Sequence, residues 1–382
     1  MIIEQTSHVD FVLVTRTKGL FFSPHRPEGF EFTPSTEFGL RFVLRPMDAE
    51  RDACGNRLGL ECKVYATFPA TEEQSMFVDS YNNRRVMLRV ADEILLPLKH
   101  REEILIDKDG KYKEHYHPRR YLCPSDIVRL IEFAESELAS KTNHFLKLLR
   151  WRQGIDAPGE VMEHSSLYWK VGAGEYPLAP LTGGPSEKFV SHGMQGIHWD
   201  DEDPKNLHEL WKKNNIAEPL GHALVREAAA LASESPRSAI LIMTAALETA
   251  VKTHISNIAP FADWLMEEAP SPPIFKILRD YIPLIHLKQG NELGFWNKVK
   301  PFIKEIEKLI VVRNKVAHTG KIPEDASSID FYLGLVSDLL FLLDVLAGHD
   351  WAKTLASYEF RKALDWPAPA HGVFSLTISQ SY

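Results

Sequence analysis

The feature that most constrains the fold is a stretch with helical periodicity late in the chain, from Ile303 to Gly320, whose apolar positions begin just before it at Val299. Its apolar residues are Val299, Phe302, Ile303, Ile306, Leu309, Ile310, Val316 and Ala317. This spacing of three and four predicts an amphipathic helix with one buried face. Arg313 lies on the same stripe, where a guanidinium is costly to bury unless it is paired or faces a polar cavity. Asn314 and His318 are four residues apart and share a face, and Gly320 ends the helix. Three polar groups therefore gather at the exposed end of a buried helix.

The length and composition of the chain set the broad class of protein. A chain of 382 residues is long for one hydrophobic core, so two or three domains are expected. Hydrophobic residues at 44% and charged residues at 25% are typical of a soluble globular protein. The net charge of −8 argues against a general nucleic-acid coat but leaves room for a local basic groove.

Cysteine usage and the apolar runs indicate the compartment. Cys54, Cys62 and Cys123 match neither a CxxC metal motif nor a disulfide framework, which favours a reducing compartment. The N-terminal residues lack a basic region followed by an apolar one, so no signal peptide is expected. The densest apolar run, Leu339 to Leu343, is too short to span a bilayer. We therefore expect a cytoplasmic protein without membrane contact.

Residues 1–122 are predicted to form a mainly β domain. The stretches rich in β-branched and aromatic residues are Val9 to Val14, Gly39 to Leu44, Leu58 to Phe68 and Val86 to Leu98. The segments 24–36 and 70–85 are expected to be long polar connections between strands. Asp109-Gly110 predicts a tight hairpin.

Residues 123–203 are expected to link this domain to a second one. A helix is predicted from Ser125 to Trp151, closed by Gly154, and its terminal cations are explained by the helix dipole alone. A Gly-, Pro- and Trp-containing connector follows, with a strand expected at Ser166 to Trp169.

Residues 204–350 are predicted to be an antiparallel helical bundle, and residues 351–382 a tail that is part helix and part extended. The helix from Ser235 to Ile255 is apolar almost all round, so we expect it at the centre of the bundle. The fold class expected for the chain is therefore α+β.

Arg313, Asn314 and His318 have the chemical groups that RNA cleavage by its own 2′-hydroxyl requires. His318 would move protons, Arg313 would neutralise a phosphate oxyanion, and Asn314 would fix the geometry by hydrogen bonds. In the alternative interpretation, Arg313 forms a structural ion pair and His318 only interacts with the helix dipole.

The RN-x3-H sequence at the end of a late helix, inside a multi-helix bundle, resembles the HEPN superfamily over residues 204–350. The family motif is R-x4-6-H, which Arg313 and His318 match at the four-residue spacing. The resemblance implies a metal-independent endoribonuclease without a cofactor, of the kind found in toxin, antiviral and RNA-processing systems. It also implies a homodimer in which two motifs face one cleft. By position, Arg313 and His318 would be catalytic and Asn314 supporting.

Two features leave the resemblance open to a second interpretation. Some members of the superfamily have lost activity and serve as dimerisation, ligand-binding or partner-binding modules, which is our alternative for this chain. The segment from Pro260 to Pro273 also departs from the minimal bundle and affects the expected shape of the substrate cleft.

Glu248 is a further candidate, because it interrupts an apolar helix where an isolated carboxylate is costly to bury. It would either pair with Arg313 and hold its guanidinium, or lie on the one exposed sector of that helix.

The segment from Lys111 to Tyr121 (KYKEHYHPRRY) interleaves cations with aromatic residues, a mixture that binds phosphates and stacks bases. Its proposed RNA-binding residues are Lys111, Lys113, Arg119 and Arg120. The alternative is a solvated strand edge.

No metal site is expected from the sequence. His115 and His117 lack further ligands nearby, and the cluster of His192, His198, Asp200 and Asp201 fits no metal motif, so it is interpreted as part of an acidic linker. The sequence also contains no Walker loop, GxGxxG, HExxH or GxSxG motif.

Overall fold

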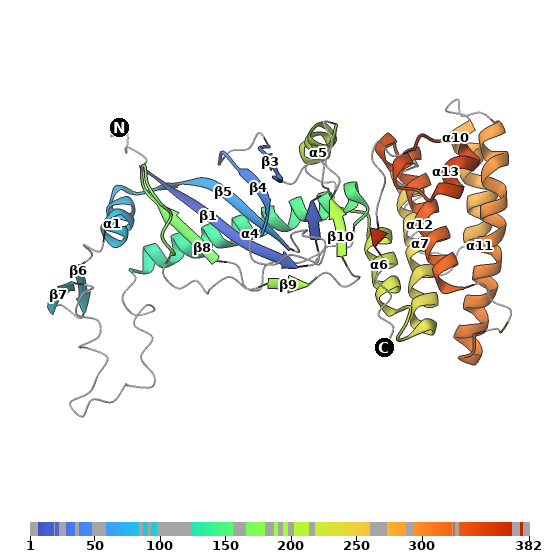
Figure 1. Cartoon of the computed structure of the whole chain (residues 1–382), viewed down its shortest axis with the longest axis horizontal. Helices are drawn as coiled ribbons and strands as arrows, with labels where there is room; N and C mark the ends of the chain where they lie inside the picture. Colours follow the sequence, from blue (N-terminus) through green and yellow to red (C-terminus); the bar gives the residue numbers. More distant parts are fainter. Residues whose placement is uncertain are drawn as a thin grey trace. The chain divides into compact units, whose positions relative to one another are not determined.

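The structure is a computed structural model in which contacts divide the chain into two compact units (Figure 1). Unit 1 comprises Met1–Leu146, Ala157–Trp211 and Leu376–Tyr382, and unit 2 comprises Lys147–Asp156 and Lys212–Ser375. The residues that the structure describes are 7–18, 20–22, 28–34, 38–47, 59–83, 87–90, 93–97, 124–155, 166–179, 187–189, 194–197, 202–213, 218–259, 273–287, 293–322, 324, 328–368 and 375–376.

Unit 1 is built on an antiparallel sheet with strand order β3-β4-β5-β1-β8, to which β9 adds in parallel beside β1. Smaller sheets have the orders β11-β10-β2 and β6-β7. The strands are β1 Ser7–Lys18, β2 Leu20–Phe22, β3 Phe30–Phe32, β4 Arg41–Pro46, β5 Gly59–Ala70, β6 Met87–Val90, β7 Glu93–Pro97, β8 Ser166–Lys170, β9 Glu187–Phe189, β10 Met194–Ile197 and β11 Ser375–Leu376.

The main sheet of unit 1 is covered along one face, and its inner strand β1 is buried at every residue from Phe11 to Thr15. In β5, burial alternates with solvent contact along most of the strand. The helix α4, Ser125–Gln153, runs along the buried face, where Phe145 stacks on Phe42 with ring centroids 4.2 Å apart (Figure 1). The helix α5, Asp203–Lys212, adds Trp211, whose ring lies 5.5 Å from that of Phe42.

Two expectations for unit 1 were wrong in detail. The segment 70–85, expected as a polar connection, contains the helix α1, Glu72–Asn82. Thr71 and Gln74 form a capping box, which satisfies free backbone N–H groups at the start of this helix, and the helix buries its own Val78. The segment 24–36 contains the short strand β3, which pairs with β4.

The strand expected in the connector at Ser166 to Trp169 is confirmed as β8. It pairs with β1, so that Phe11 lies opposite Trp169, and it therefore belongs to the main sheet. The expected hairpin at Asp109-Gly110 lies outside the described residues.

Unit 2 is helical, and the prediction of a mixed fold with a sheet followed by helices is confirmed. Its main helices stand side by side (Figure 1). The helical segments are α6 Leu220–Leu231, α7 Pro236–Ile258, α9 Ile274–Lys276, the π-helical turn η3 Ile277–Tyr281, α10 Ile282–Leu287, α11 Leu293–Thr319, α12 Ile329–Leu346, the 3-10 turn η4 Asp350–Thr354 and α13 Tyr358–Leu364.

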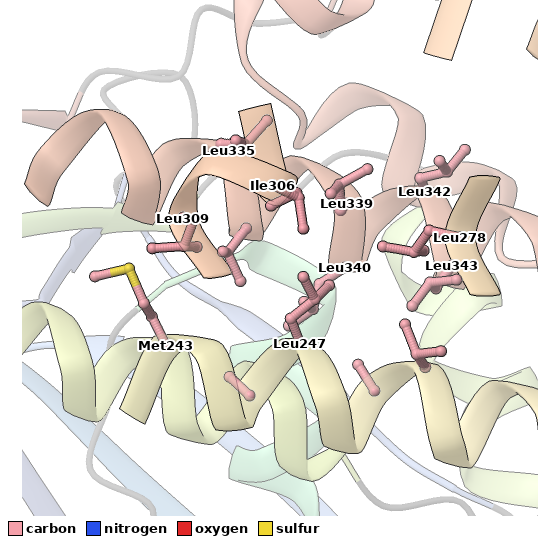
Figure 2. Packing of buried hydrophobic residues seen from close by; sticks show 14 of the residues in the cluster. Met243, Leu247, Leu278, Ile306, Leu309, Leu335, Leu339, Leu340, Leu342 and Leu343 are labelled. Carbon is pink, nitrogen blue, oxygen red and sulfur yellow. The ribbon is translucent and has the colours of Figure 1, made fainter. Parts of the chain in front are cut away.

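The core of unit 2 forms where α7, α11 and α12 meet. Figure 2 shows Met243 and Leu247 of α7 near Ile306 and Leu309 of α11, with Leu340 of α12 between the helices. The helix α12 is the most enclosed, since every residue from 339 to 344 is buried. The expectation that α7 is central holds only in part, because Leu241 on its outer side is 38% exposed.

Within unit 2, the buried carboxylate of Asp344 connects α6 and α12 with the last turns of α4, which belong to this unit from Lys147 onward. One carboxylate oxygen accepts hydrogen bonds from Trp151 Nε1 at the end of α4, at 2.9 Å, and from His222 Nε2 of α6, at 2.8 Å. All three side chains are buried. A buried charge is tolerated only when such donors replace water, so this network determines how α4, α6 and α12 pack.

The cations that end α4 also make specific contacts in unit 2. Arg150 donates through Nε to the nearly fully buried Glu218, at 2.8 Å, and Arg226 pairs with the same carboxylate. The guanidinium of Arg152 lies 5.2 Å from the ring centre of Trp351. The helix dipole alone therefore does not explain these residues.

A substitution of Asp344 tests this network. Asp344→Asn keeps the shape but replaces the charged oxygen that accepts from both donors with a neutral amide oxygen, which weakens both hydrogen bonds, so we expect unit 2 to lose about 1–3 kcal/mol of unfolding free energy. Asp350→Asn is the matched control, because that side chain is 82% exposed and pairs only at the surface with Lys353. Urea denaturation followed by circular dichroism measures both variants, and equal stability of the two would contradict the role given to Asp344.

Unit 2 also contains a buried pair of histidines. His254 of α7 and His286 of α10 face each other with 2.9 Å between their Nε2 atoms. A hydrogen bond between these nitrogens needs one donor and one acceptor, so at least one ring is neutral. Burial, with a further contribution from His286, lowers the pKa of His254 to about 4, against an opposite effect of Asp344.

The low pKa of His254 predicts acid sensitivity. The unfolded chain binds a proton near the ordinary histidine pKa of about 6.5, and the folded chain binds it only near pH 4, so stability is lost as the pH falls through this window. The full loss attributable to this side chain is about 3 kcal/mol. His254→Gln does not titrate, so urea denaturation between pH 7 and 4.5 should show a shallower decline. Identical slopes for wild type and variant would refute this explanation.

Candidate functional site

The candidate site lies at the C-terminal end of α11, as the sequence predicted. Arg313 is half-buried, whereas Asn314 and His318 are exposed. Gly320 ends the helix with a φ of +66°, and its N–H donates to the carbonyl of Val316 at 2.8 Å. The left-handed conformation suits glycine, so the helix ends at Thr319, one residue after His318.

The hydrogen bond between Arg313 and Asn314 shows how the guanidinium is directed. His318 is five positions after Arg313, which places their Cα atoms on sides of the helix about 140° apart. Asn314 shares the face of His318. Arg313 donates from Nη1 to Asn314 Oδ1 at 3.0 Å, which draws its guanidinium round toward that face.

The charge of Arg313 is not neutralised by any carboxylate among the described residues. Its one hydrogen bond within this part of the chain is to the neutral amide of Asn314. A cation whose charge is uncompensated, with donors still available, is suited to bind an anionic oxygen.

The sequence predicted that Glu248 either pairs with Arg313 or lies on the exposed sector of α7. In the described part of the chain it does not pair with Arg313, and it is only partly exposed. Its side chain is 22% exposed, and it pairs with Lys252 one turn further along α7, at 3.1 Å. Among the described residues it makes no ion pair with Arg313. A supporting role for Glu248 is therefore not evident from its contacts.

The remaining predicted site residues cannot be placed. Lys111, Lys113, Arg119 and Arg120 lie outside the described residues, as do the histidines of the same segment. The same is true of His192, His198, Asp200, Asp201 and residues 260–272. Within the described ranges, no group of three or more His, Cys, Asp or Glu side chains is arranged to hold a metal ion.

The sequence interpretation missed a row of lysines on the outer side of α11. Lys300, Lys304, Lys308 and Lys315 are all exposed on this helix. The spacing of four between the first three and of seven before Lys315 repeats one side of a helix, and together with the apolar stripe it is a sequence signal that would have located them.

Comparisons of the chain with protein-family models, with curated proteins and with solved structures found no match. None of the helices in the described part of the chain has the length and apolar character needed to cross a membrane. The function of this chain is therefore argued from its own residues.

Arg313→Ala distinguishes a structural from a chemical role of the arginine. Because no described carboxylate depends on Arg313, we expect the variant to remain folded, with a loss of unfolding free energy of at most about 1 kcal/mol. Circular dichroism during thermal unfolding measures this. A variant that fails to fold would instead favour a structural ion pair.

Proposed function

We propose that the chain is a metal-independent endoribonuclease whose active site is built on the C-terminal end of α11. The observation that carries the proposal is the state of Arg313: it is half-buried, is oriented by Asn314 and has no carboxylate partner among the described residues. Such a guanidinium is available for a phosphate. The HEPN resemblance of the RNKVAH sequence supports the same assignment.

In the proposed reaction, a histidine removes the proton from a ribose 2′-hydroxyl, and the oxygen attacks the adjacent phosphorus. The bond from phosphorus to the 5′-oxygen breaks, and a protonated histidine gives its proton to that oxygen. Arg313 stabilises the negative charge that develops on the phosphorane oxygens. The products are a 2′,3′-cyclic phosphate and a free 5′-hydroxyl, so the step needs no water and no metal.

The proposed active site uses two copies of the chain. The reaction needs one base and one acid, and His318 is the single histidine in the last turn of α11. A homodimer that brings two such helix ends together supplies both histidines and two guanidinium groups. Asn314 acts as a positioning residue, because it holds Arg313 rather than the substrate.

The second candidate function is a non-catalytic dimerisation or partner-binding module. The exposure of Val311 favours it, since this apolar side chain is 64% exposed on the outer side of α11. Contact with another helix would remove Val311 from water.

Cleavage of RNA in EDTA decides between the two candidates. We expect purified wild-type protein to cleave total RNA in EDTA, His318→Ala to lose activity by at least about a hundredfold, and Arg313→Ala to be similarly impaired. His8→Ala is the control, because His8 is an exposed histidine on β1, in unit 1. Intact RNA in both the wild-type and His318→Ala lanes would contradict the endoribonuclease assignment and favour the binding module.

A further inference from the structure

The outer side of α11 is strongly basic in an otherwise acidic chain. The helix has two acidic residues, Glu305 and Glu307, and six basic ones, whereas the whole chain has a net charge of −8. The basic residues are Lys298, Lys300, Lys304, Lys308, Arg313 and Lys315.

Most of this positive charge is not compensated by ion pairs within the described residues. Lys298 pairs with Asp365, and Lys308 pairs with Glu305 at 2.8 Å. Lys300 reaches only the neutral amide of Asn297, at 2.9 Å. Lys304 and Lys315 have no partner among the described residues, and both are exposed.

The lysines follow one line along the helix. Lys300, Lys304 and Lys308 succeed one another at intervals of about 6 Å along the helix axis. Lys315 continues the line beyond Val311, and His318 follows less than one turn later. We call the exposed side formed by Lys300, Lys304, Lys308, Lys315 and His318 the lysine ridge.

We infer that the lysine ridge binds the sugar–phosphate backbone of single-stranded RNA and leads it to His318. The identity of the ligand rests on the proposed function, whereas the row of cations is independent of it. An ammonium group neutralises phosphates whatever the sequence of the RNA. A single strand fits better than a duplex, because attack by a 2′-hydroxyl on its own phosphate needs a nucleotide free to rotate into line. The exposure of Val311 alone would support a protein partner, but it is the one large apolar side chain exposed along the described ridge, and the four lysines beside it favour an anionic ligand.

A non-cleavable RNA separates binding from catalysis. Fluorescence anisotropy with a labelled 2′-O-methyl oligoribonucleotide measures the affinity of the full chain over a range of salt concentrations. The test variant combines Lys300→Ala, Lys304→Ala and Lys315→Ala. The control combines Lys213→Ala, Arg237→Ala and Lys362→Ala, which removes the same charge from exposed positions on other segments of unit 2.

We expect the ridge variant to bind about tenfold or more weakly and to lower the slope of log affinity against log salt by about 2, since each phosphate contact on a single strand contributes about 0.7. The control should change far less. Equal affinities and slopes for the two variants would overturn the inference. A ridge variant that changes only the oligomeric state in sedimentation would also overturn it, because the ridge would then be an interface between copies of the chain.

The outcome is distinguishable from failure of the proposed function. If wild-type protein cleaves natural RNA but the ridge variant binds like the control, the inference that the lysine ridge binds RNA is wrong and the nuclease assignment stands. If wild-type protein binds RNA through the ridge but never cleaves it, the nuclease assignment is wrong and the inference that the ridge binds RNA stands. Circular dichroism confirms that both triple variants are folded.

Discussion

The hydrogen-bonded carboxylate of Asp344 is the interaction on which the packing of unit 2 depends most. It lies in α12, the most enclosed helix, and a charge in that position needs donors from other segments. Trp151 and His222 supply them, so the end of α4 and the start of α6 are fixed against α12. With these elements in place, α7 and α12 offer a continuous apolar surface for the inner side of α11. The position of α11, and therefore of the candidate site, follows from that packing.

The helix α11 combines two different surfaces, and the candidate site lies where they meet. Its inner side is apolar and packs in the core, and its outer side has the lysines and His318. Arg313 lies between the two, half-buried, and its hydrogen bond to Asn314 directs the charge outward. The partial burial of Arg313 and its hydrogen bond to Asn314 restrict its side chain more than full exposure would. In the proposed active site, these two features orient the guanidinium without an ion pair among the described residues.

Local sequence patterns were sufficient to predict most helices and strands, but not which distant residues contact each other. Stretches rich in β-branched and aromatic residues predicted β1, β4 and β5, and helical periodicity with Gly320 predicted α11 and its end. The capping box of Thr71 and Gln74 was present in the sequence but was interpreted as part of a loop. In contrast, Trp151 and Asp344 are separated by 193 positions, and no local rule connects residues so distant. The sequence also left two possible partners for Glu248, namely Lys252 one turn away and the distant Arg313. The packing of the helices shows that the ion pair is with Lys252.

We propose that RNA is cut by its own 2′-hydroxyl at the end of α11. The most direct measurement uses an oligoribonucleotide with one preferred cleavage position, compared with the same molecule carrying a single 2′-deoxy nucleotide there. Mass spectrometry of the products in EDTA should show a 2′,3′-cyclic phosphate and a 5′-hydroxyl from the first substrate, and no cleavage at the deoxy position of the second. Cleavage at the deoxy position, or products with a 5′-phosphate, would contradict the account.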